Sequence, residues 1–419
     1  MQQQEIYIGF PPLPDKKAIV EALLHDPPHL HWQMVRQLFR IKEISDREDL
    51  IRELQPYLKN IDDWRLYSRL HLALQALHRP IKITGYHLVK GKGAVKISED
   101  GKLEDEGASP FKVPLFPVVD FHIQPKVPDL KFFTDMREAG VTHGVVVASD
   151  TDPEDVDRPE VRQQLKSAFD QSPSSGRMTF DSLLKHVKKS LYTPTHVTNN
   201  DVADWVSDYP DILIGIGSVN LGKDQSYVLK NLEEIERLKL RGLKFMPHAQ
   251  FFNPAENEHM PMVFEFCRQG GYIVLSHAGC GQGPFEMIEL SKNSHPSLWE
   301  PWLKKYPEVP LVFCHAGAYS TEIPGIWLFD ALQLAKSHSN AYIDLAGVDW
   351  LLDRENVIQE IRKTIGFDRV LFATDYPAPL STGASWAYVA KRVQTNSNLT
   401  PKEKHKILGQ NAARLLGLS

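Results

Sequence analysis

Cysteine is scarce in this chain of 419 residues. The three cysteines, Cys267, Cys280 and Cys314, are an odd number and form no C-x-x-C pair, which argues against a disulfide framework and fits a reducing compartment. No apolar run approaches the roughly 20 residues that a membrane-spanning helix needs. The first residues, MQQQEIYIGF, lack the charged segment and apolar core of a signal peptide. These absences predict a soluble cytoplasmic protein.

An excess of one charge is also missing. The chain has 48 lysines and arginines against 53 aspartates and glutamates, a net charge of -5, and it contains no long basic run. We therefore expect neither a nucleic-acid surface nor an anionic-membrane surface, and we expect a small-molecule partner instead. Hydrophobic residues make up 42% and charged residues 24%, as in ordinary globular proteins.

Three regions of different composition follow one another along the chain. Residues 1–90 predict a helical module, because DKKAIVEALL carries apolar residues at helical spacing and Ser45 and Glu48 have the spacing of a capping box. Residues 91–115 are polar and rich in glycine, which indicates a linker or a meandering hairpin. We found no chemistry in these two parts and assign residues 116–419 to a separate domain.

The third region alternates short apolar runs with helical patterns. The eight runs are PVVDFHI, THGVVVAS, ILIGIGSV, RGLKFMP, YIVLSHAG, LVFCHAG, AYIDLAG and RVLFATDYP. Runs rich in Val, Ile and Leu are typical of parallel strands buried on both faces. The region from Val118 to Pro377 spans about 260 residues, near the ~250 of a (β/α)8 TIM barrel. A doubly wound sheet is disfavoured because its glycine fingerprint is absent. We predict an α/β barrel with an N-terminal helical extension.

One connection is longer than a barrel needs. About 60 residues separate VVVAS from ILIGIG, and a loop of this length usually covers the mouth of a barrel or contacts a partner. We interpret it as a lid or an entrance wall.

Polar side chains gather at the carboxyl ends of the predicted strands, where barrel enzymes assemble their sites. A single histidine at a strand end could be a satisfied core residue. Several histidines and a carboxylate at one barrel end instead indicate a site for zinc, manganese or iron. In chain order the polar residues at these ends are His122, Gln124, Lys244, His248, His277, His315 and Asp375.

The segments DFHIQ, GLKFMP, VLSHAG, VFCHAG and ATDYP, in this order and spacing, carry a resemblance to a known family. The chain from about residue 116 to 418 resembles the amidohydrolase superfamily. The similar branch contains 2-amino-3-carboxymuconate-semialdehyde decarboxylase, related aromatic-acid decarboxylases and lactone hydrolases. The first 110 residues or so lie outside the resemblance.

The resemblance implies a role for each matching residue. His122 and His277 would be metal ligands, and Asp375 would bind the metal or its water and pass on a proton. His315 would stand beside that water as a general base or polarising group. Lys244 would be a structural cation or hold a substrate carboxylate, and the histidine just beyond the same run, His248, is a second anion-binding candidate.

Gln124 departs from the family pattern, which has a second histidine two residues after His122. An amide oxygen is a poorer donor to zinc than an imidazole. Three outcomes stay open at this point. The site could bind one Zn²⁺ more weakly through His122, His277 and Asp375, it could prefer the harder Mn²⁺, or it could hold no metal.

The sequence leaves two reactions and one non-catalytic function open. The first is a metal-dependent hydrolase that attacks a small ester, lactone or amide with a metal-activated water. The alternative is non-oxidative decarboxylation of an aromatic or muconate-type acid. A second alternative is a barrel with a degraded metal site that acts as a binding protein. The family resemblance implies a homodimer as one assembly open to the chain.

Overall fold

The structure is a computed structural model. It describes residues 15–25, 38, 41, 44–58, 70, 73, 77, 86–89, 91–96, 116–125, 128–176, 178–192, 197–281, 286–320, 323–377 and 386–418.

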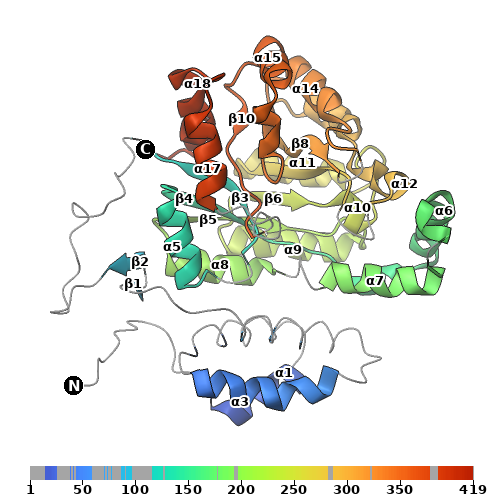
Figure 1. Ribbon diagram of the computed structural model, residues 1–419. Coiled ribbons are helices and arrows are strands. Elements are labelled where there is room, and N and C mark those ends of the chain that lie inside the picture. The colour runs from blue at the N-terminus through green and yellow to red at the C-terminus, as the bar shows by residue number, and fades with distance from the viewer. Residues whose placement is uncertain are drawn as a thin grey trace.

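Eight parallel strands lie side by side in chain order and form the centre of the molecule (Figure 1). The predicted (β/α)8 barrel is thereby confirmed, and each apolar run of the sequence contains one strand. The strands are β3 (Val119–Ile123), β4 (His143–Val147), β5 (Leu213–Ser218), β6 (Gly242–Phe245), β7 (Ile273–Gly279), β8 (Leu311–Tyr319), β9 (Ala341–Asp344) and β10 (Val370–Leu371).

The barrel closes through the segment that follows β10. The N–H of Phe121 in β3 donates to Phe372 O at 2.9 Å, and the N–H of Gln124 donates to Tyr376 O at 2.8 Å. Ile123 also forms a parallel bridge with Tyr376. The carboxyl end of the first strand is therefore fixed beside the residues that follow the last strand.

Helices surround the barrel, and their apolar faces cover the outer faces of the strands (Figure 1). In α9, Val228, Leu232 and Ile235 are buried at helical spacing and face the strands. The main surrounding helices are α5 (Leu130–Glu138), α8 (Asn199–Asp208), α9 (Gln225–Arg237), α11 (Met260–Gly270), α13 (Glu300–Lys305), α14 (Leu328–Ser337), α15 (Glu355–Thr364), α17 (Trp386–Thr395), α18 (Pro401–His405) and α19 (Asn411–Leu416).

The inner faces of the strands form a second core. In β7, Ile273 and Leu275 belong to this inner core, whereas Val274 between them packs with the outer helices. Side chains alternate along a strand in this way, so a polar residue two places beyond Leu275 also faces inward. That residue is His277.

The long second connection contains two helices, α6 (Pro159–Gln171) and α7 (Phe180–Tyr192), with short helices η3 (Pro153–Asp157) and η4 (Pro173–Gly176). They share a small apolar core that includes Leu165, Leu184 and Val187 and extends to Met246 and Met287 on the barrel rim. Helix α6 packs on α12 (Ile288–Ser291), and α10 (Pro247–Gln250) lies next to α12. The connection thus forms a helical wall beside the rim.

The carboxylate of Asp150 links the segments that follow β4 and β5 at this rim. Asp150 accepts hydrogen bonds from Tyr227 Oη at 2.8 Å and from the N–H of Asn220 at 2.7 Å. Lys223 next to it forms ion pairs with Asp152 at 2.7 Å and with Asp155 at 2.6 Å. Burial raises the pKa of the Asp150 carboxyl to about 6.

The N-terminal part has a core of its own. Helices α1 (Lys16–His25) and α3 (Ile44–Leu54) with η1 (Gln55–Leu58) lie in this part. Ile19, Leu23 and Leu50 are among its buried residues. The hairpin of β1 (Tyr86–Val89) and β2 (Gly93–Lys96) crosses the predicted boundary at residue 90, and Arg137 of α5 donates to Ala94 O.

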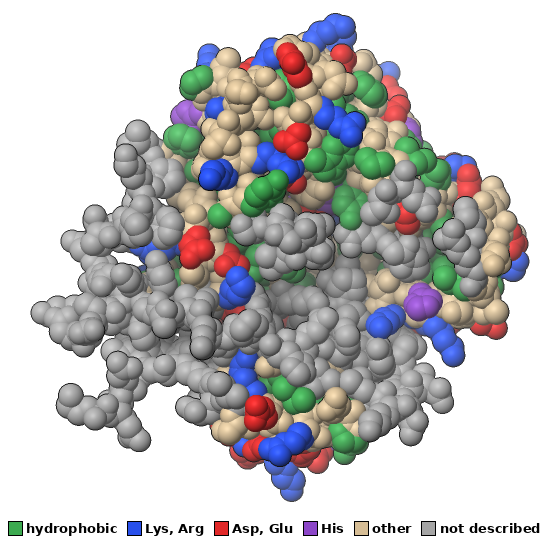
Figure 2. Space-filling model, in the orientation of Figure 1, with side chains coloured by type: hydrophobic (Ala, Val, Ile, Leu, Met, Phe, Trp, Pro, Cys, Tyr) green, Lys and Arg blue, Asp and Glu red, His purple; other side chains and the backbone are tan. Residues whose placement is uncertain are grey.

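The surface mixes charges of both signs. On the face shown in Figure 2, lysine and arginine side chains alternate with aspartate and glutamate, and among the described residues in view no large area carries one sign. Every helix in the described part of the chain is too short or too polar to cross a bilayer.

The C-terminal helical segment leaves no space for a side chain at Gly409, in the π-helical turn η9 (Lys406–Gln410). A Cβ at this position would lie 1.7 Å from Pro117 O, just before β3. We expect Gly409→Ala to lower the free energy of unfolding by about 1–3 kcal/mol, the usual cost of overpacking. Gly176→Ala is the control, because its Cβ would meet nothing within 4 Å. Equal melting temperatures for both variants would contradict this close approach.

Asp150 should make stability fall as pH rises. Its folded-state pKa of about 6 lies above the ordinary value of 3.8. The folded chain therefore holds a proton that the unfolded chain releases, and stability decreases between these two values. We expect Asp150→Asn, which mimics the protonated form, to flatten the melting temperature over this range. Asp224→Asn is the contrast, because a hydrogen bond from Ser226 lowers the pKa of Asp224 and its contribution is lost as pH falls.

Candidate functional site

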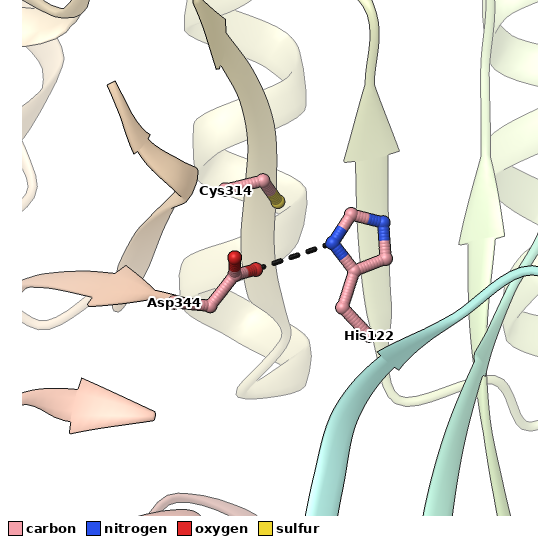
Figure 3. Close-up of side chains that lie close together, drawn as sticks. All are labelled: His122, Cys314 and Asp344. Carbon is pink, nitrogen blue, oxygen red and sulfur yellow. Dashed lines mark hydrogen bonds and ion pairs between the residues drawn. The ribbon is translucent and has the colours of Figure 1, made fainter. Parts of the chain in front are cut away.

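A buried chain of hydrogen bonds crosses the carboxyl end of the barrel. His122 Nδ1 lies 3.2 Å from Asp344 Oδ2, and His122 Nε2 lies 3.1 Å from Lys244 Nζ. A carboxylate only accepts, so Nδ1 carries the proton and Nε2 accepts from the lysine ammonium. Figure 3 shows His122 on β3 and Asp344 on β9 pointing toward one another, with Cys314 of β8 beside them.

The strands bring these side chains together by their inward faces. Leu243 and Phe245 pack in the outer core, so Lys244 between them faces inward. Cys314 belongs to the inner core as well. In β3 the pairing with β4 shifts register between Asp120 and Ile123, which interrupts the regular alternation of faces around His122.

Asp344 holds both the ring of His122 and the backbone of the next strand end. Its Oδ1 accepts from the N–H of His315 at 2.7 Å and from the N–H of Ala346 at 3.0 Å. Burial would raise the pKa of this carboxyl, but the hydrogen bond from His122 and the nearby charges hold the pKa below its ordinary value. Asp344 is therefore a carboxylate with a fixed set of donors.

Lys244 is almost fully enclosed. Its side chain is 1% exposed, and its Nζ donates to Cys314 Sγ at 3.1 Å as well as to His122. Burial and the charge of Asp344 raise the pKa of the Cys314 thiol well above its ordinary value. The thiol therefore stays protonated beside the ammonium.

Three further imidazoles form a row at the same rim. The ring centroids of His248 and His277 are 4.4 Å apart, those of His277 and His315 are 4.6 Å apart, and those of His315 and His122 are 5.3 Å apart. Burial lowers the pKa of His248 to about 3 and that of His315 to about 4, and it lowers the pKa of His277 well below the ordinary value. All three rings are therefore neutral at neutral pH.

The hydrogen bonds of these rings also fix their tautomers. His315 Nδ1 donates to Ala346 O at 2.8 Å, so its Nε2 has a lone pair. His277 Nε2 donates to Cys280 O at 3.1 Å, so its lone pair is on Nδ1. His315 and Ala316 have φ of 61° and 52°, a left-handed conformation that turns the chain sharply at the rim.

Asp375 and Gln124 lie at the closing seam. Asp375 Oδ1 is 3.8 Å from His122 Nε2, its side chain is 13% exposed, and its N–H donates to His122 O at 3.0 Å. Gln124 follows the end of β3 and is half-buried. The structure thus brings all seven predicted site residues to one end of the barrel, and their roles in binding and catalysis stay predictions.

Two residues of the site, Cys314 and Asp344, are not among the seven predicted from the sequence. From the sequence alone, Cys314 fits small apolar packing, and Asp344 fits a residue that lines the mouth or one that holds loop backbone. The structure gives Asp344 the backbone role and, in addition, the bond to His122. Their strand-end positions in LVFCHAG and AYIDLAG were the available signal.

Within the described residues, one group of side chains could hold a metal ion. Among the described residues, His122, Cys314 and Asp344 have ligand atoms within 4.8 Å of one another. The expected set of His122, His277 and Asp375 does not form such a group in that part of the chain. The structure thus supports the expected metal ion only in so far as a group of candidate donors is present.

These donors do not fit a divalent ion as they stand. Both nitrogens of His122 are engaged, one by Asp344 and one by Lys244. A thiol is a metal ligand only as a thiolate, and the pKa of Cys314 is raised. A divalent ion about 4 Å from the Lys244 ammonium would also be repelled by roughly 8 kcal/mol at an effective dielectric constant of about 20.

Comparison with known proteins identifies the family. Residues 119–418 match the amidohydrolase family. The chain belongs to this family. The resemblance and the enzyme class expected from the sequence are thereby confirmed at the level of the family.

Two kinds of relative are similar to this member of the family. A 2-amino-3-carboxymuconate-6-semialdehyde decarboxylase of Dictyostelium discoideum is 25% identical over 247 residues, which are 52% of this chain and 65% of that protein. The match thus spans less than two thirds of the relative. An uncharacterized TIM-barrel protein of Bordetella bronchiseptica has a TM-score of 0.52 at 18% identity, covering 72% of this chain and 99% of that one. This likeness supports the barrel fold.

A decarboxylase structure is similar at a lower level. The 5-carboxyvanillate decarboxylase LigW of Sphingomonas paucimobilis has a TM-score of 0.45 at 16% identity, covering 69% of this chain and 83% of that chain.

Asp344→Asn should disturb the site without changing its shape. The new amide would donate toward His122 Nδ1, which would push the ring proton onto Nε2, against Lys244. We expect the free energy of unfolding to fall by about 3–5 kcal/mol, as when one partner of a buried pair is removed. Chemical denaturation measures this change, and ¹⁵N NMR of the ring reports the tautomer. Asp353→Asn, at a side chain 54% exposed, is the control. An unchanged tautomer would refute the hydrogen-bond assignment.

Proposed function

We propose that this chain catalyses the non-oxidative decarboxylation of a small aromatic or muconate-type carboxylic acid. The observation that carries the proposal is the 25% identity over 247 residues to a 2-amino-3-carboxymuconate-6-semialdehyde decarboxylase. Hydrolysis of an ester, lactone or amide, the first reaction expected from the sequence, ranks second. It ranks second because the relative is a decarboxylase and not a hydrolase.

The reaction requires a proton at the carbon that loses its carboxylate. R–COO⁻ and one proton become R–H and CO₂, and the electron pair of the broken carbon–carbon bond forms the new C–H bond. His315 is the residue we propose for this transfer, because its Nε2 has a lone pair while Nδ1 is held by Ala346 O. It takes a proton from an acidic group of the substrate and gives it to the carbon, and the substrate group regains its proton from solvent.

The charges of the site suit an acidic substrate. Lys244 supplies a buried positive charge near the row of imidazoles. His248, which is neutral, can donate one ring N–H to a carboxylate without adding charge. Asp375, 3.8 Å from His122, is the second residue that we propose for proton transfer, at the seam. In this proposal the partner is a small acid, with no nucleic acid or membrane involved.

An activity assay with two substrate classes tests the proposal. We expect CO₂ release from muconate-type or hydroxybenzoate-type acids and no acid release from lactones and esters in a pH-stat. His315→Asn should lower kcat by about 10²–10⁴, the usual contribution of a positioned acid–base group. Asparagine is the replacement of choice because it tolerates the left-handed backbone found at this position.

His143→Asn is the matched control. His143 is the first residue of β4, at the opposite end of the strand from the site, and it bonds to Thr142. This variant should keep the full kcat. Acid release from lactones without CO₂ release would favour the hydrolase. Ligand binding without either reaction would favour the non-catalytic barrel.

A further inference from the structure

Lys244 reaches across the barrel to side chains of two other strands. Its Nζ lies 3.1 Å from His122 Nε2 on β3 and 3.1 Å from Cys314 Sγ on β8. These atoms are a nitrogen lone pair and a sulfur, which are typical donors to a transition metal. Here both donors face the Lys244 ammonium. The ammonium therefore occupies the position that a metal ion would need in order to bind these two donors.

The orientation of His122 supports this arrangement. A histidine that binds a metal usually donates its other ring N–H to a carboxylate, which aims the lone pair at the ion. His122 has this partner in Asp344, at 3.2 Å, and the aimed lone pair ends on Lys244 Nζ. The hydrogen bond to Asp344 thus orients the His122 imidazole toward an ammonium instead of a metal ion.

The position of Lys244 is fixed by its strand. The neighbours Leu243 and Phe245 are fully buried in the outer core. The carbonyl of Lys244 accepts from Ser218 Oγ at 2.8 Å, and the residue pairs with Leu275 of β7. Moving the ammonium out of the site would require the side chain to leave an enclosed position that is 1% exposed.

Carboxylates supply the negative charge that faces the Lys244 ammonium. Asp344 faces the ammonium through His122, and Asp375 lies 3.8 Å from His122 Nε2, the atom that accepts from Lys244. Gln124, where the family pattern has an imidazole, removes one strong donor from the same rim. Lys244 and Gln124 act in one direction, because a protein cation needs fewer metal-type donors than an ion does.

We propose that in this chain the Lys244 ammonium takes the place of the divalent metal ion expected for the family. The inference does not rest on the proposed reaction, because it concerns which cation the side chains hold. It assigns Lys244 as the positive centre of the site and makes His122, Cys314 and Asp344 its supporting groups.

Metal binding by the full-length protein tests this inference without an activity assay. We expect wild-type protein purified without chelator to contain substoichiometric transition metal, and added Zn²⁺ or Mn²⁺ should be lost on dialysis. Lys244→Met removes the charge but keeps a chain of similar length. It should bind Zn²⁺ at least about tenfold more tightly in titration calorimetry, an effect of ~1.4 kcal/mol.

Two further variants separate the lysine from the glutamine. Gln124→His adds the family imidazole but leaves the ammonium, so it should bind no more metal than wild type. Lys244→Met combined with Gln124→His should bind Zn²⁺ more tightly than Lys244→Met alone. Lys406→Met, a loss of charge outside the site where Lys406 pairs with Asp368, should behave as wild type.

Several outcomes would overturn the inference. Stoichiometric Zn²⁺ or Mn²⁺ that resists dialysis in wild-type protein would show that the lysine does not exclude the ion. A gain of metal in Gln124→His alone would assign the effect to residue 124. A folded Lys244→Met that binds no more metal than wild type would also refute it. If Lys244→Met does not fold, the wild-type metal content and the Gln124→His titration still decide the question.

Discussion

The hydrogen-bonded series from Asp344 through His122 to Lys244 is the interaction on which this site depends. Its members come from β9, β3 and β6, so it forms only after the barrel has closed. Inside a protein an unpaired charge is costly, and a pair costs less when every donor and acceptor is used. Asp344 fulfils this condition by also accepting from the backbone of His315 and Ala346.

The backbone hydrogen bonds that close the barrel also fix the geometry of the site. The first strand meets the last through backbone bonds, and one of them joins Asp375 N–H to His122 O. The ring of His122 therefore sits at the seam, with the Asp344 carboxylate at Nδ1 and the Lys244 ammonium at Nε2. A change that loosens the seam changes the position of His122 as well as the stability of the barrel.

Much of the fold was predictable because its signals are local. Each strand is a short run of Val, Ile and Leu, and the carboxyl ends of parallel strands must meet at one rim. The same rule placed His122, His277 and His315 together. Contact between particular atoms was not predictable, because Lys244 and His122 are 122 positions apart. No pattern shows that a side chain of one strand fills the space between two others. The same reason hid the pairing of Asp344 with His122.

The lysine also changes what the neighbouring histidines can do. Burial lowers the pKa of His248, His277 and His315, and the Lys244 charge lowers it further for all three. The charge of Lys244 therefore adds to burial in keeping the rings neutral, and neutral imidazole both accepts and donates protons. A divalent ion would draw lone pairs from the rings for coordination, whereas an ammonium uses only that of His122. The ammonium does not take the lone pairs of His277 Nδ1 and His315 Nε2, which links the cation at the centre to the proton chemistry at the rim.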